Sequence, residues 1–170
     1  TNPLENKRSY SSLYSTYLQD YTNVPGGQYN ESMLDSPRSW YAGTGDANQY
    51  ITIDLDTTKT VVGGITQGRA DSDHWVTTYK VSFSTDNITY LYITTTGTTS
   101  DASLAQTFIG NTDRNTKVEN IFNSSIQARY VKYHPITWTT YVSIRAGVLI
   151  ALPNTTTTVP PTTTTVPPTT

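Results

Sequence analysis

Side chains that could do chemistry are few in this sequence of 170 residues. The histidines are His74 and His134, and neither lies in an HExxH motif; GxSxG and P-loop motifs are absent. Cysteine is absent, which excludes disulfides, thiolate nucleophiles and zinc-thiolate sites. Asp54 and Asp56 share one face of a predicted strand, and two carboxylates could in principle hydrolyse a glycosidic bond. We expect instead that Asp54 pairs with a framework arginine such as Arg145, and that the protein is not an enzyme.

Two alternating carboxylates, Asp71 and Asp73, raise one metal hypothesis. Oxygen ligands at alternate positions of a loop are typical of calcium sites. No glutamate follows at the spacing of an EF-hand, and Ala-Asp-Ser-Asp is a common turn sequence. We therefore expect no cofactor, with calcium at these two residues as the open alternative.

The charge and the apolar pattern exclude two broad classes of partner. The sequence has 13 acidic and 11 basic residues and a net charge of −2, which argues against a nucleic-acid-binding face. No apolar run approaches the roughly 18 residues that a membrane span needs. Residues 1–20 lack a basic segment followed by an apolar stretch, so we expect a mature form that retains no signal peptide.

The composition favours strands over helices. Threonine is abundant and tyrosine occurs 13 times, and both fit the half-buried surface of a sheet, whereas the best helix formers are sparse. Short apolar or alternating segments lie between turn residues at intervals typical of a sandwich or barrel. The predicted strands cover residues 50–55, 60–66, 75–84, 88–94, 127–134 and 142–150. The sequence therefore predicts an all-β fold and argues against a doubly wound one.

Three of these segments carry more detailed predictions. In residues 50–55, the apolar side chains at positions 51, 53 and 55 lie on one face. Two glycines interrupt the strand at residues 60–66, and Asp86 and Asn87 form the turn of a hairpin between 75–84 and 88–94. Alternation in residues 75–84 puts five side chains on one side: Trp75, Thr77, Tyr79, Val81 and Phe83.

Read in order, six segments resemble the discoidin domain, also called the coagulation factor V/VIII type C domain. They are QYITIDLD (49–56), VVGGITQGR (61–69), HWVTTYKVSFSTDNITY (74–90), FIGNTDRNTKVENIF (108–122), ARYVKYHP (128–135) and SIRAGVLI (143–150). The resemblance extends from Tyr10 to Ala151 and implies an eight-stranded antiparallel jelly-roll β-sandwich. It also implies that loops at one end of the barrel bind a ligand, which in the family is a galactose-type sugar, an anionic phospholipid head group, collagen or another protein.

The framework of the domain raises two further expectations. Many animal members of the family join their ends through a disulfide, and this sequence has no cysteine. We therefore expect strand pairing alone to hold the ends together. We also expect Trp40, Trp75 and Trp138 to lie in the core rather than to form ligand platforms.

The resemblance places the ligand-binding loops within residues 19–31, 41–48 and 69–74. Their carboxylates, amides and arginine could hydrogen-bond sugar hydroxyls, while an aromatic ring could stack on a sugar. The expected ligand-binding residues are Tyr41, Asp46, Asn48, Arg69, Asp71, Asp73 and His74, with Tyr21 and Tyr29 nearby. Membrane-binding members carry large apolar and basic residues here, and Arg69 is the only basic residue of these loops, so a sugar is favoured over a bilayer. The alternative is that the loops are solvated turns.

A change of composition near Pro153 divides the sequence into a domain of residues 1–153 and a tail of residues 154–170. The tail repeats TTTTVPP, carries no charge and cannot bury enough surface to fold, so we expect an extended polyproline II stalk. Its composition is typical of O-glycosylated stalks, and a plain spacer is the alternative. The O-glycosylation candidates are Thr155, Thr156, Thr157, Thr158, Thr162, Thr163, Thr164 and Thr165.

Four N-x-S/T sequences mark N-glycosylation candidates, at Asn30, Asn87, Asn123 and Asn154. Asn87 in the hairpin turn and Asn154 at the tail junction are the best placed of the four.

These observations favour a secreted, non-enzymatic adhesion module that binds a glycan or matrix ligand outside the cell or at its surface. One alternative is a structural subunit of an extracellular glycosylated fibre or coat, which assembles as Val159 and Val166 of the tail contact a neighbouring protomer. Another is the targeting module of a larger secreted enzyme. None of the three uses nucleic acid or a membrane span.

Overall fold

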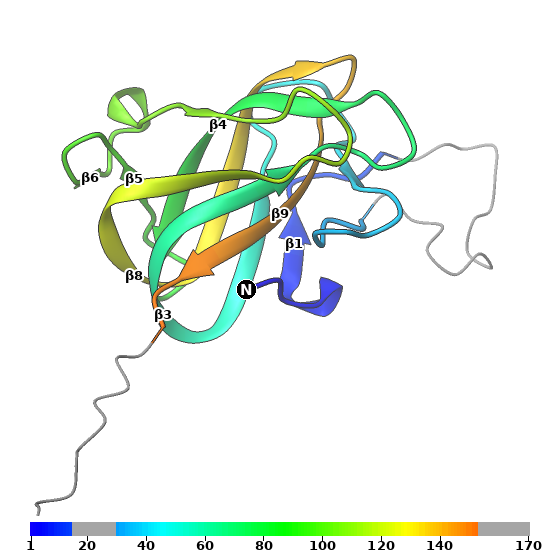
Figure 1. The fold of residues 1–170 in the computed structure, drawn as a ribbon. Coiled ribbons are helices and arrows are strands. Elements are labelled where there is room, and N and C mark those ends of the chain that lie inside the picture. Colours follow the sequence, from blue (N-terminus) through cyan, green and yellow to red (C-terminus); the bar gives the residue numbers. More distant parts are fainter. Residues whose placement is uncertain (15–29, 153–170) are drawn as a thin grey trace, which may run out of the picture.

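Antiparallel strands build the chain in the computed structural model, which describes residues 1–14 and 30–152 (Figure 1). The elements among these residues are η1 (Glu5–Lys7), β1 (Arg8–Tyr10), β2 (Trp40–Tyr41), β3 (Ile51–Gln67), β4 (Trp75–Ser84), β5 (Leu91–Ile93), β6 (Thr98–Thr99), η3 (Ala102–Leu104), β7 (Phe108–Ile109), β8 (Val118–Thr139) and β9 (Ser143–Ile150). Both helices are single 3₁₀ turns. The predicted all-β antiparallel fold is confirmed, with nine strands in the described residues, of which three are only two residues long.

Two layers face each other, and β3 and β8 belong to both of them (Figure 1). In the first layer, the start of β3 pairs with β1 and with the end of β8, and β4, β5 and β6 follow. In the second layer, the end of β3 pairs with β9 and with the start of β8, and β2 pairs with β9. β3 changes layer between Asp54 and Lys59, where the register shifts and Asp56 has a φ of 66°.

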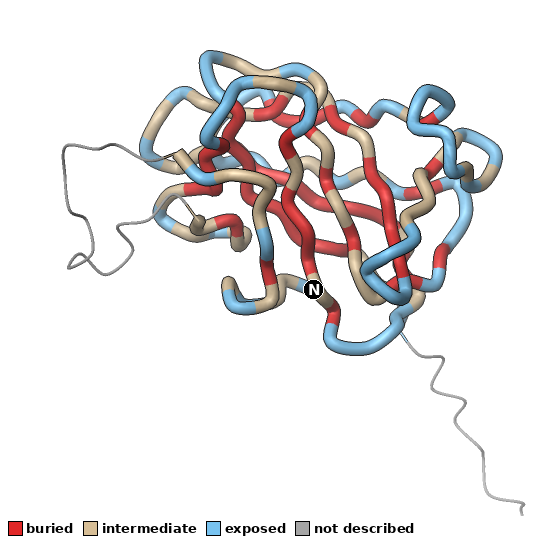
Figure 2. Tube along the Cα trace, turned by 180° about the vertical axis from the view of Figure 1, so that it is seen from behind, coloured by how far each residue is buried: buried red, intermediate tan, exposed pale blue. Residues whose placement is uncertain are grey.

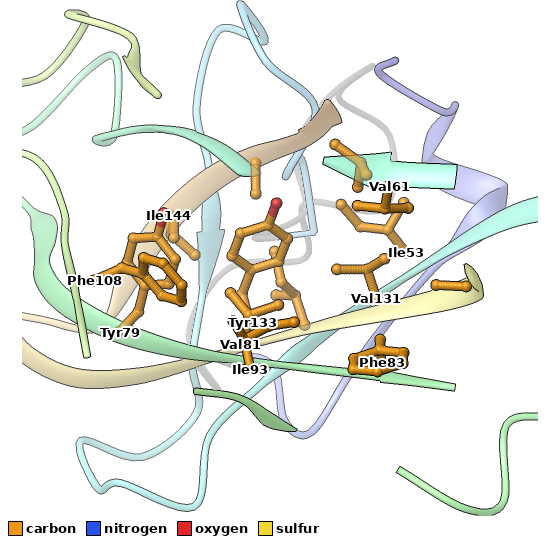
Figure 3. Close-up of a cluster of buried hydrophobic side chains, with 14 of the residues drawn as sticks. Ile53, Val61, Tyr79, Val81, Phe83, Ile93, Phe108, Val131, Tyr133 and Ile144 are labelled. Atoms are coloured by element: carbon orange, nitrogen blue, oxygen red, sulfur yellow. The ribbon is translucent and has the colours of Figure 1, made fainter. Parts of the chain in front are cut away.

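Buried residues are concentrated in the strands (Figure 2), and the apolar side chains among them form a core between the layers (Figure 3). Ile51, Ile53 and Leu55 are all buried, as the sequence predicts. Tyr133 is fully buried and reaches from the first layer into the second, where its hydroxyl donates a hydrogen bond to the carbonyl oxygen of Gly147. Burial of these apolar and aromatic side chains is the main favourable contribution to folding.

The predicted break at residues 60–66 takes the form of a register shift between Val61 and Gly63, while β3 itself continues through both glycines. A Cβ on Gly64 would lie 2.6 Å from the hydroxyl oxygen of Tyr133. Glycine at this position therefore serves the close approach of the two layers and does not end the strand.

The predicted face of β4 is correct only in its second half. Tyr79, Val81 and Phe83 are buried, but it is Val76, rather than its neighbours Trp75 and Thr77, that enters the core. Two register shifts against β8, between Val76 and Tyr79, change the alternation at this point. The hairpin prediction is confirmed in outline, although β5 is shorter than expected.

The three tryptophans differ in their surroundings. Trp40 is fully buried in the core, and Trp138 is partly buried and packs against it. Trp75 lies outside the core cluster, which corrects the expectation for that residue.

Strand pairing is not all that ties the first residues to the rest of the domain. Arg8 pairs through its backbone with Ile53, but its side chain is also buried and donates hydrogen bonds to the carbonyl oxygens of Ser32 and Ala146. The guanidinium thus links the N-terminal segment to β9 in the second layer. The expectation that strand pairing alone does this is therefore incomplete.

Some predictions fall outside the described residues. These are the first ligand loop up to residue 29, Asn154, the proposed tail of residues 154–170 and its O-glycosylation candidates. None of the helices in the described part of the chain has the length and apolar character that a membrane crossing requires.

Candidate functional site

Three connections between strands meet at one end of the two layers, and we call them the tip loops. They are residues 42–50 between β2 and β3, residues 68–74 between β3 and β4, and residues 140–142 between β8 and β9. Strand pairing brings them together, because β2 pairs with the start of β9, the end of β3 also pairs with β9, and the start of β4 pairs with the end of β8.

A cluster of aromatic rings forms where the tip loops meet. Tyr14 stacks on Tyr41 with ring centroids 4.4 Å apart and planes 6° from parallel. Tyr141 tilts against Tyr41 at 5.2 Å and stands edge-on to His74 at 4.9 Å. Tyr41 is buried, whereas Tyr141 is 48% exposed, so the cluster has a fixed inner part and an accessible outer ring.

These rings line a small pocket of about 110 Å³, which we call the tip pocket. Its lining consists of Tyr14, Tyr41, Ala42, Gly43, Thr44, Gly45, Tyr141 and Val142. Three of these residues are tyrosines, and the others are small, with a hydroxyl group on Thr44. Such a shape suits a ligand that has a flat apolar face and hydroxyl groups at its edge.

Arg69 and Asp71 lie beside the aromatic cluster. The guanidinium carbon of Arg69 is 5.6 Å from the centroid of the Tyr41 ring, within cation–π range. Its Nε and Nη2 donate to the two carboxylate oxygens of Asp71 at 2.5 and 3.2 Å. The pKa of Asp71 is lowered mainly by this hydrogen bonding. The pair therefore presents a fixed guanidinium and an ionised carboxylate, and the Asp71 side chain is 42% exposed.

His74 is held by its own loop and by Tyr141. Its backbone N–H donates to the carbonyl oxygen of Ser72, and its carbonyl oxygen accepts from the N–H of Arg69. Burial first, and then the nearby charge of Arg69, lower the pKa of the imidazole. The ring is therefore neutral at neutral pH and acts as an aromatic surface.

Asp46 braces the loop between β2 and β3. Its carboxylate accepts hydrogen bonds from the hydroxyl of Thr44, the backbone N–H of Asn48 and the side-chain amide of Gln49. These bonds, that from Thr44 first, lower the pKa of Asp46. Asn48 is exposed on the same loop. All three donors belong to this loop, so the Asp46 carboxylate shapes one side of the tip pocket.

Asp73 points away from the aromatic cluster to another loop. Its carboxylate accepts a 2.7 Å hydrogen bond from Nε of Arg114, and this bond lowers its pKa. Asp71 and Asp73 thus each face a different arginine. Within the described residues, no group of three or more side chains could hold a metal ion, and calcium stays a prediction.

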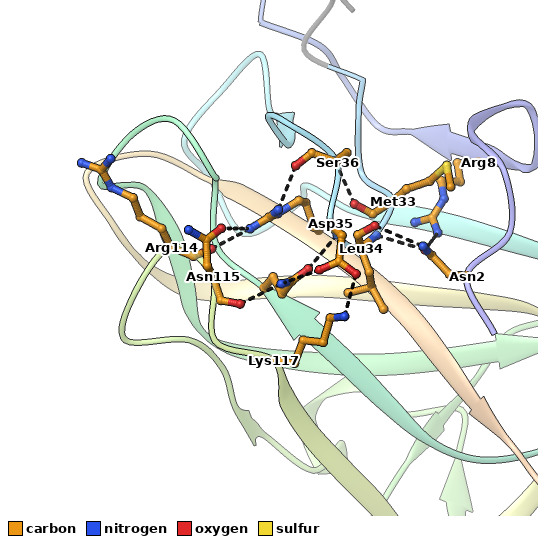
Figure 4. A network of polar contacts seen from close by, with 11 residues as sticks. Asn2, Arg8, Met33, Leu34, Asp35, Ser36, Arg114, Asn115 and Lys117 are labelled. Atoms are coloured by element: carbon orange, nitrogen blue, oxygen red, sulfur yellow. Dashed lines mark hydrogen bonds and ion pairs between the residues drawn. The ribbon is translucent and has the colours of Figure 1, made fainter.

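A network of polar contacts around one buried arginine reaches the start of the tip loop at residues 68–74 (Figure 4). Arg145 is 2% exposed and donates hydrogen bonds to the carbonyl oxygens of Gly68, Ser36 and Arg114 and to the side chain of Asn115. One guanidinium therefore ties together three segments that are distant in sequence.

The predicted pairing of Asp54 with Arg145 is wrong. Asp54 receives two hydrogen bonds of 2.9 and 3.0 Å from Arg129, which lies next to it across the β3–β8 pairing. Arg145 lies on β9 under the tip loops, and its donors are used by the oxygen atoms there. Asp56 instead forms an ion pair with Lys7, so the two carboxylates do not work as a pair.

The structure brings together four of the predicted site residues: Tyr41, Arg69, Asp71 and His74. It also adds Tyr14 and Tyr141, which the sequence analysis missed. The signal for Tyr141 was a tyrosine in the short link between the last two predicted strands, a link that the family resemblance did not single out.

Comparison with known proteins identifies the architecture. The family model of the F5/8 type C domain matches residues 10–148. The chain is 34% identical to one form of discoidin-1 from Dictyostelium discoideum over 140 residues, which cover 76% of this chain and 52% of that protein. It is 35% identical to discoidin-2 of the same organism over 122 residues, or 72% of this chain and 44% of the relative. The chain thus spans about half the length of these relatives.

Solved structures agree with this match. Wild-type discoidin II of Dictyostelium discoideum superposes with a TM-score of 0.61 and 27% identity, over 83% of this chain and 52% of that one. A Clostridium perfringens module solved with GalNAc-β-1,3-galactose has the same fold, with a TM-score of 0.56, 15% identity, and coverage of 82% of this chain and 88% of the other. The chain therefore belongs to the F5/8 type C, or discoidin, domain family.

Proposed function

We propose that this chain is a non-enzymatic recognition module that binds a carbohydrate in the tip pocket. The observation that carries the proposal is the partly exposed Tyr141 beside a small pocket, with the Arg69–Asp71 pair on the same loop cluster. We place the module outside the cell or at its surface, where glycans of cells and matrix are accessible.

Each part of the site has a role in sugar binding. The ring of Tyr141 offers a face on which the apolar side of a pyranose can stack. Asp71 accepts two hydrogen bonds from Arg69, and a carboxylate has further lone pairs to accept from sugar hydroxyls. Thr44 also lines the pocket, and its hydroxyl donates to Asp46 and accepts from Gln49, which fixes its position.

The comparisons support a carbohydrate as the class of ligand. The family match gives the domain type, and the Clostridium perfringens module shows that this fold can carry a disaccharide in that protein. The described tip loops also lack the cluster of large apolar and basic side chains that insertion into an anionic bilayer would use. The fibre hypothesis depends on the tail and stays a prediction.

Replacement of Arg69 by Ala and of Tyr141 by Ala tests the proposed site. Loss of a charge-assisted hydrogen bond should weaken binding by about 1–3 kcal/mol. Loss of the stacking ring should cost about 1 kcal/mol. A glycan array would identify a ligand and calorimetry would measure the affinity, with Lys59→Ala on the exposed turn of β3 as the matched control.

Thermal unfolding must accompany the binding assay, because the Arg69 side chain is only 12% exposed and its loss can also lower stability. Tyr141→Phe keeps the ring and should bind as the parent does. If both alanine variants fold and keep the parent's affinity, the tip pocket is not the binding site.

A further inference from the structure

The hairpin turn between β4 and β5 presents Asn87 to solvent next to a second pocket. Asp86 fixes this turn, because one of its carboxylate oxygens accepts hydrogen bonds from the backbone N–H groups of Ile88 and Thr89 at 2.8 and 2.9 Å. Asn87 itself has a φ of 63°, in the left-handed region that asparagine tolerates better than most residues. The sequence Asn-Ile-Thr is thus displayed on a rigid, exposed turn.

The side-chain amide of Asn87 is oriented by one neighbour. The hydroxyl of Tyr90 donates a hydrogen bond to the amide oxygen of Asn87, and the ring of Tyr90 is in turn covered by the ammonium of Lys132 at 3.7 Å. This contact uses the oxygen of the amide. The nitrogen, Nδ2, makes no hydrogen bond among the described residues, and it is the atom to which an N-linked sugar is joined.

The other described sequons are placed differently. Nδ2 of Asn123 donates a 2.6 Å hydrogen bond to the carbonyl oxygen of Thr95, so a sugar on this nitrogen would displace a bond of the fold. Asn30 forms a β-bridge with Trp40, and its carbonyl oxygen accepts from the hydroxyl of Tyr10. Of the three described sequon asparagines, Asn87 is the one that lies exposed on a turn with no hydrogen bond from its amide nitrogen among the described residues.

The adjacent pocket, which we call the hairpin pocket, has a volume of about 260 Å³. Its lining consists of Asn6, Lys7, Arg8, Ser9, Thr52, Asp54, Asn87 and Tyr130. The walls include the Asp54 carboxylate, the Lys7 ammonium, which is paired with Asp56, and side-chain amide and hydroxyl groups. Tyr130 is an aromatic side chain, and the guanidinium carbon of Arg129 lies 4.9 Å from the centroid of its ring. Hydroxyl and acetamido groups of an N-acetylglucosamine match these donors and acceptors.

The hairpin pocket lies far from the tip pocket. β4 begins beside His74 and ends at Ser84, and ten extended residues span about 30 Å. A group attached to Asn87 therefore leaves the tip loops open.

From these contacts we infer that Asn87 carries an N-linked glycan and that its first sugar lies in the hairpin pocket. Because Asn87 is itself part of the pocket wall, attachment holds the sugar next to the groups that bind it, as a short linker would. The inference is independent of sugar binding at the tip, and either can fail without the other.

The first experiment measures site occupancy. The chain is secreted from a eukaryotic host, its N-glycans are released by an amidase in heavy-oxygen water, and the peptides are mapped by mass spectrometry. We expect the label at Asn87, its loss in Thr89→Ala, and no change in Ser125→Ala, the matched variant of the Asn123 sequon. Secreted, folded protein without label at Asn87 overturns the inference.

The second experiment tests where the first sugar lies. An endoglycosidase trims the glycan to one N-acetylglucosamine, and the thermal midpoint of this form is compared with that of Thr89→Ala. We expect the trimmed form to be more stable by about 2–4 °C, the shift that one or two retained contacts give in a domain of this size. Ser9→Gln fills the pocket from an exposed position of β1 and should abolish this difference. A midpoint difference that survives Ser9→Gln, or no difference in the parent, overturns the placement in the pocket.

Discussion

His134 lies on the outer face of β8 between two tyrosines. Its ring is 5.3 Å from that of Tyr92 and 6.0 Å from that of Tyr50, and Nε2 is 2.8 Å from the hydroxyl of Ser82. Burial, followed by the charges of Lys132 and Lys80, lowers the pKa of His134 to about 4. The imidazole is therefore neutral in the folded protein over a range in which an unfolded chain would protonate it.

We predict that His134 makes the protein less stable in mild acid. Its pKa is about 4 in the folded protein and about 6.5 in the unfolded chain. The contribution of the neutral imidazole to the free energy of unfolding is therefore complete above pH 6.5 and is lost as the pH falls towards 4. The loss amounts to about 3 kcal/mol in the free energy of unfolding. Urea titrations at several pH values should show this slope in the parent and a flatter one in His134→Gln. Parallel slopes for the two proteins would contradict the prediction.

The sequence predicted which kind of partner a charged residue needs, but it did not predict which particular residue that partner is. The sequence indicated that Asp54 needs an arginine, but it does not distinguish Arg129 from Arg145 as the partner. Only the register of β3 against β8 puts Arg129 beside it. Likewise, Arg69, Asp71 and His74 were found from one contiguous loop, whereas Asp73 turns to Arg114, which no spacing in the sequence indicated.

At the scale of strands, the alternating pattern gave the type and place of most elements. It failed at Val76 because a register shift within β4 changes which side chains face inward. It also underestimated β8, which begins at Val118, because residues 118–126 show no regular alternation of polar and apolar side chains. Register shifts and layer changes depend on the partner strand and leave little trace in the segment itself.

The contact between Gly64 of β3 and Tyr133 of β8 gives a prediction at this scale. Replacement of Gly64 by Ala would put a methyl group 2.6 Å from the Tyr133 hydroxyl and should destabilise the domain by about 2 kcal/mol. Gly97→Ala, which meets nothing within 4 Å, is the matched control and should change little. Denaturant midpoints measure both, and equal midpoints would show that the layers can move apart at no cost.

At the scale of the whole molecule, the family resemblance predicted the architecture and the end of the barrel that carries the loops. It could not supply the tip pocket, because Tyr14, Tyr41 and Tyr141 come from three separate stretches of chain. Their approach follows from the pairing of β2 with β9 and from the link after β8. Long-range pairing of this kind is a property of the folded chain as a whole.

The buried side chain of Arg8 gives a prediction about what attaches the N-terminal segment to the rest of the domain. Arg8→Met removes the guanidinium hydrogen bonds to the buried carbonyl oxygens of Ser32 and Ala146, although the Ser32 oxygen keeps a second donor in the backbone N–H of Ala146. The loss should cost about 3 kcal/mol in the free energy of unfolding. Arg129→Met breaks a partly exposed ion pair with Asp54 and should cost clearly less than Arg8→Met, because solvent screens exposed charges. Chemical denaturation of the two variants should separate them clearly. Similar losses would mean that the buried guanidinium does not fasten the N-terminal segment.

The passage of β3 and β8 through both layers has a consequence for how the chain folds. β1 needs the first half of β3, and β9 needs the second half, so neither layer has a complete set of strands without the other. The paired residues are also far apart in the sequence, as Gln67 and Arg145 are. The chain must therefore lose the conformational entropy of closing large loops before these contacts can stabilise it. A half-assembled intermediate would expose the unpaired edges of the two longest strands. Because β3 and β8 contribute strand to both layers, we expect the two layers to form and unfold as one cooperative unit.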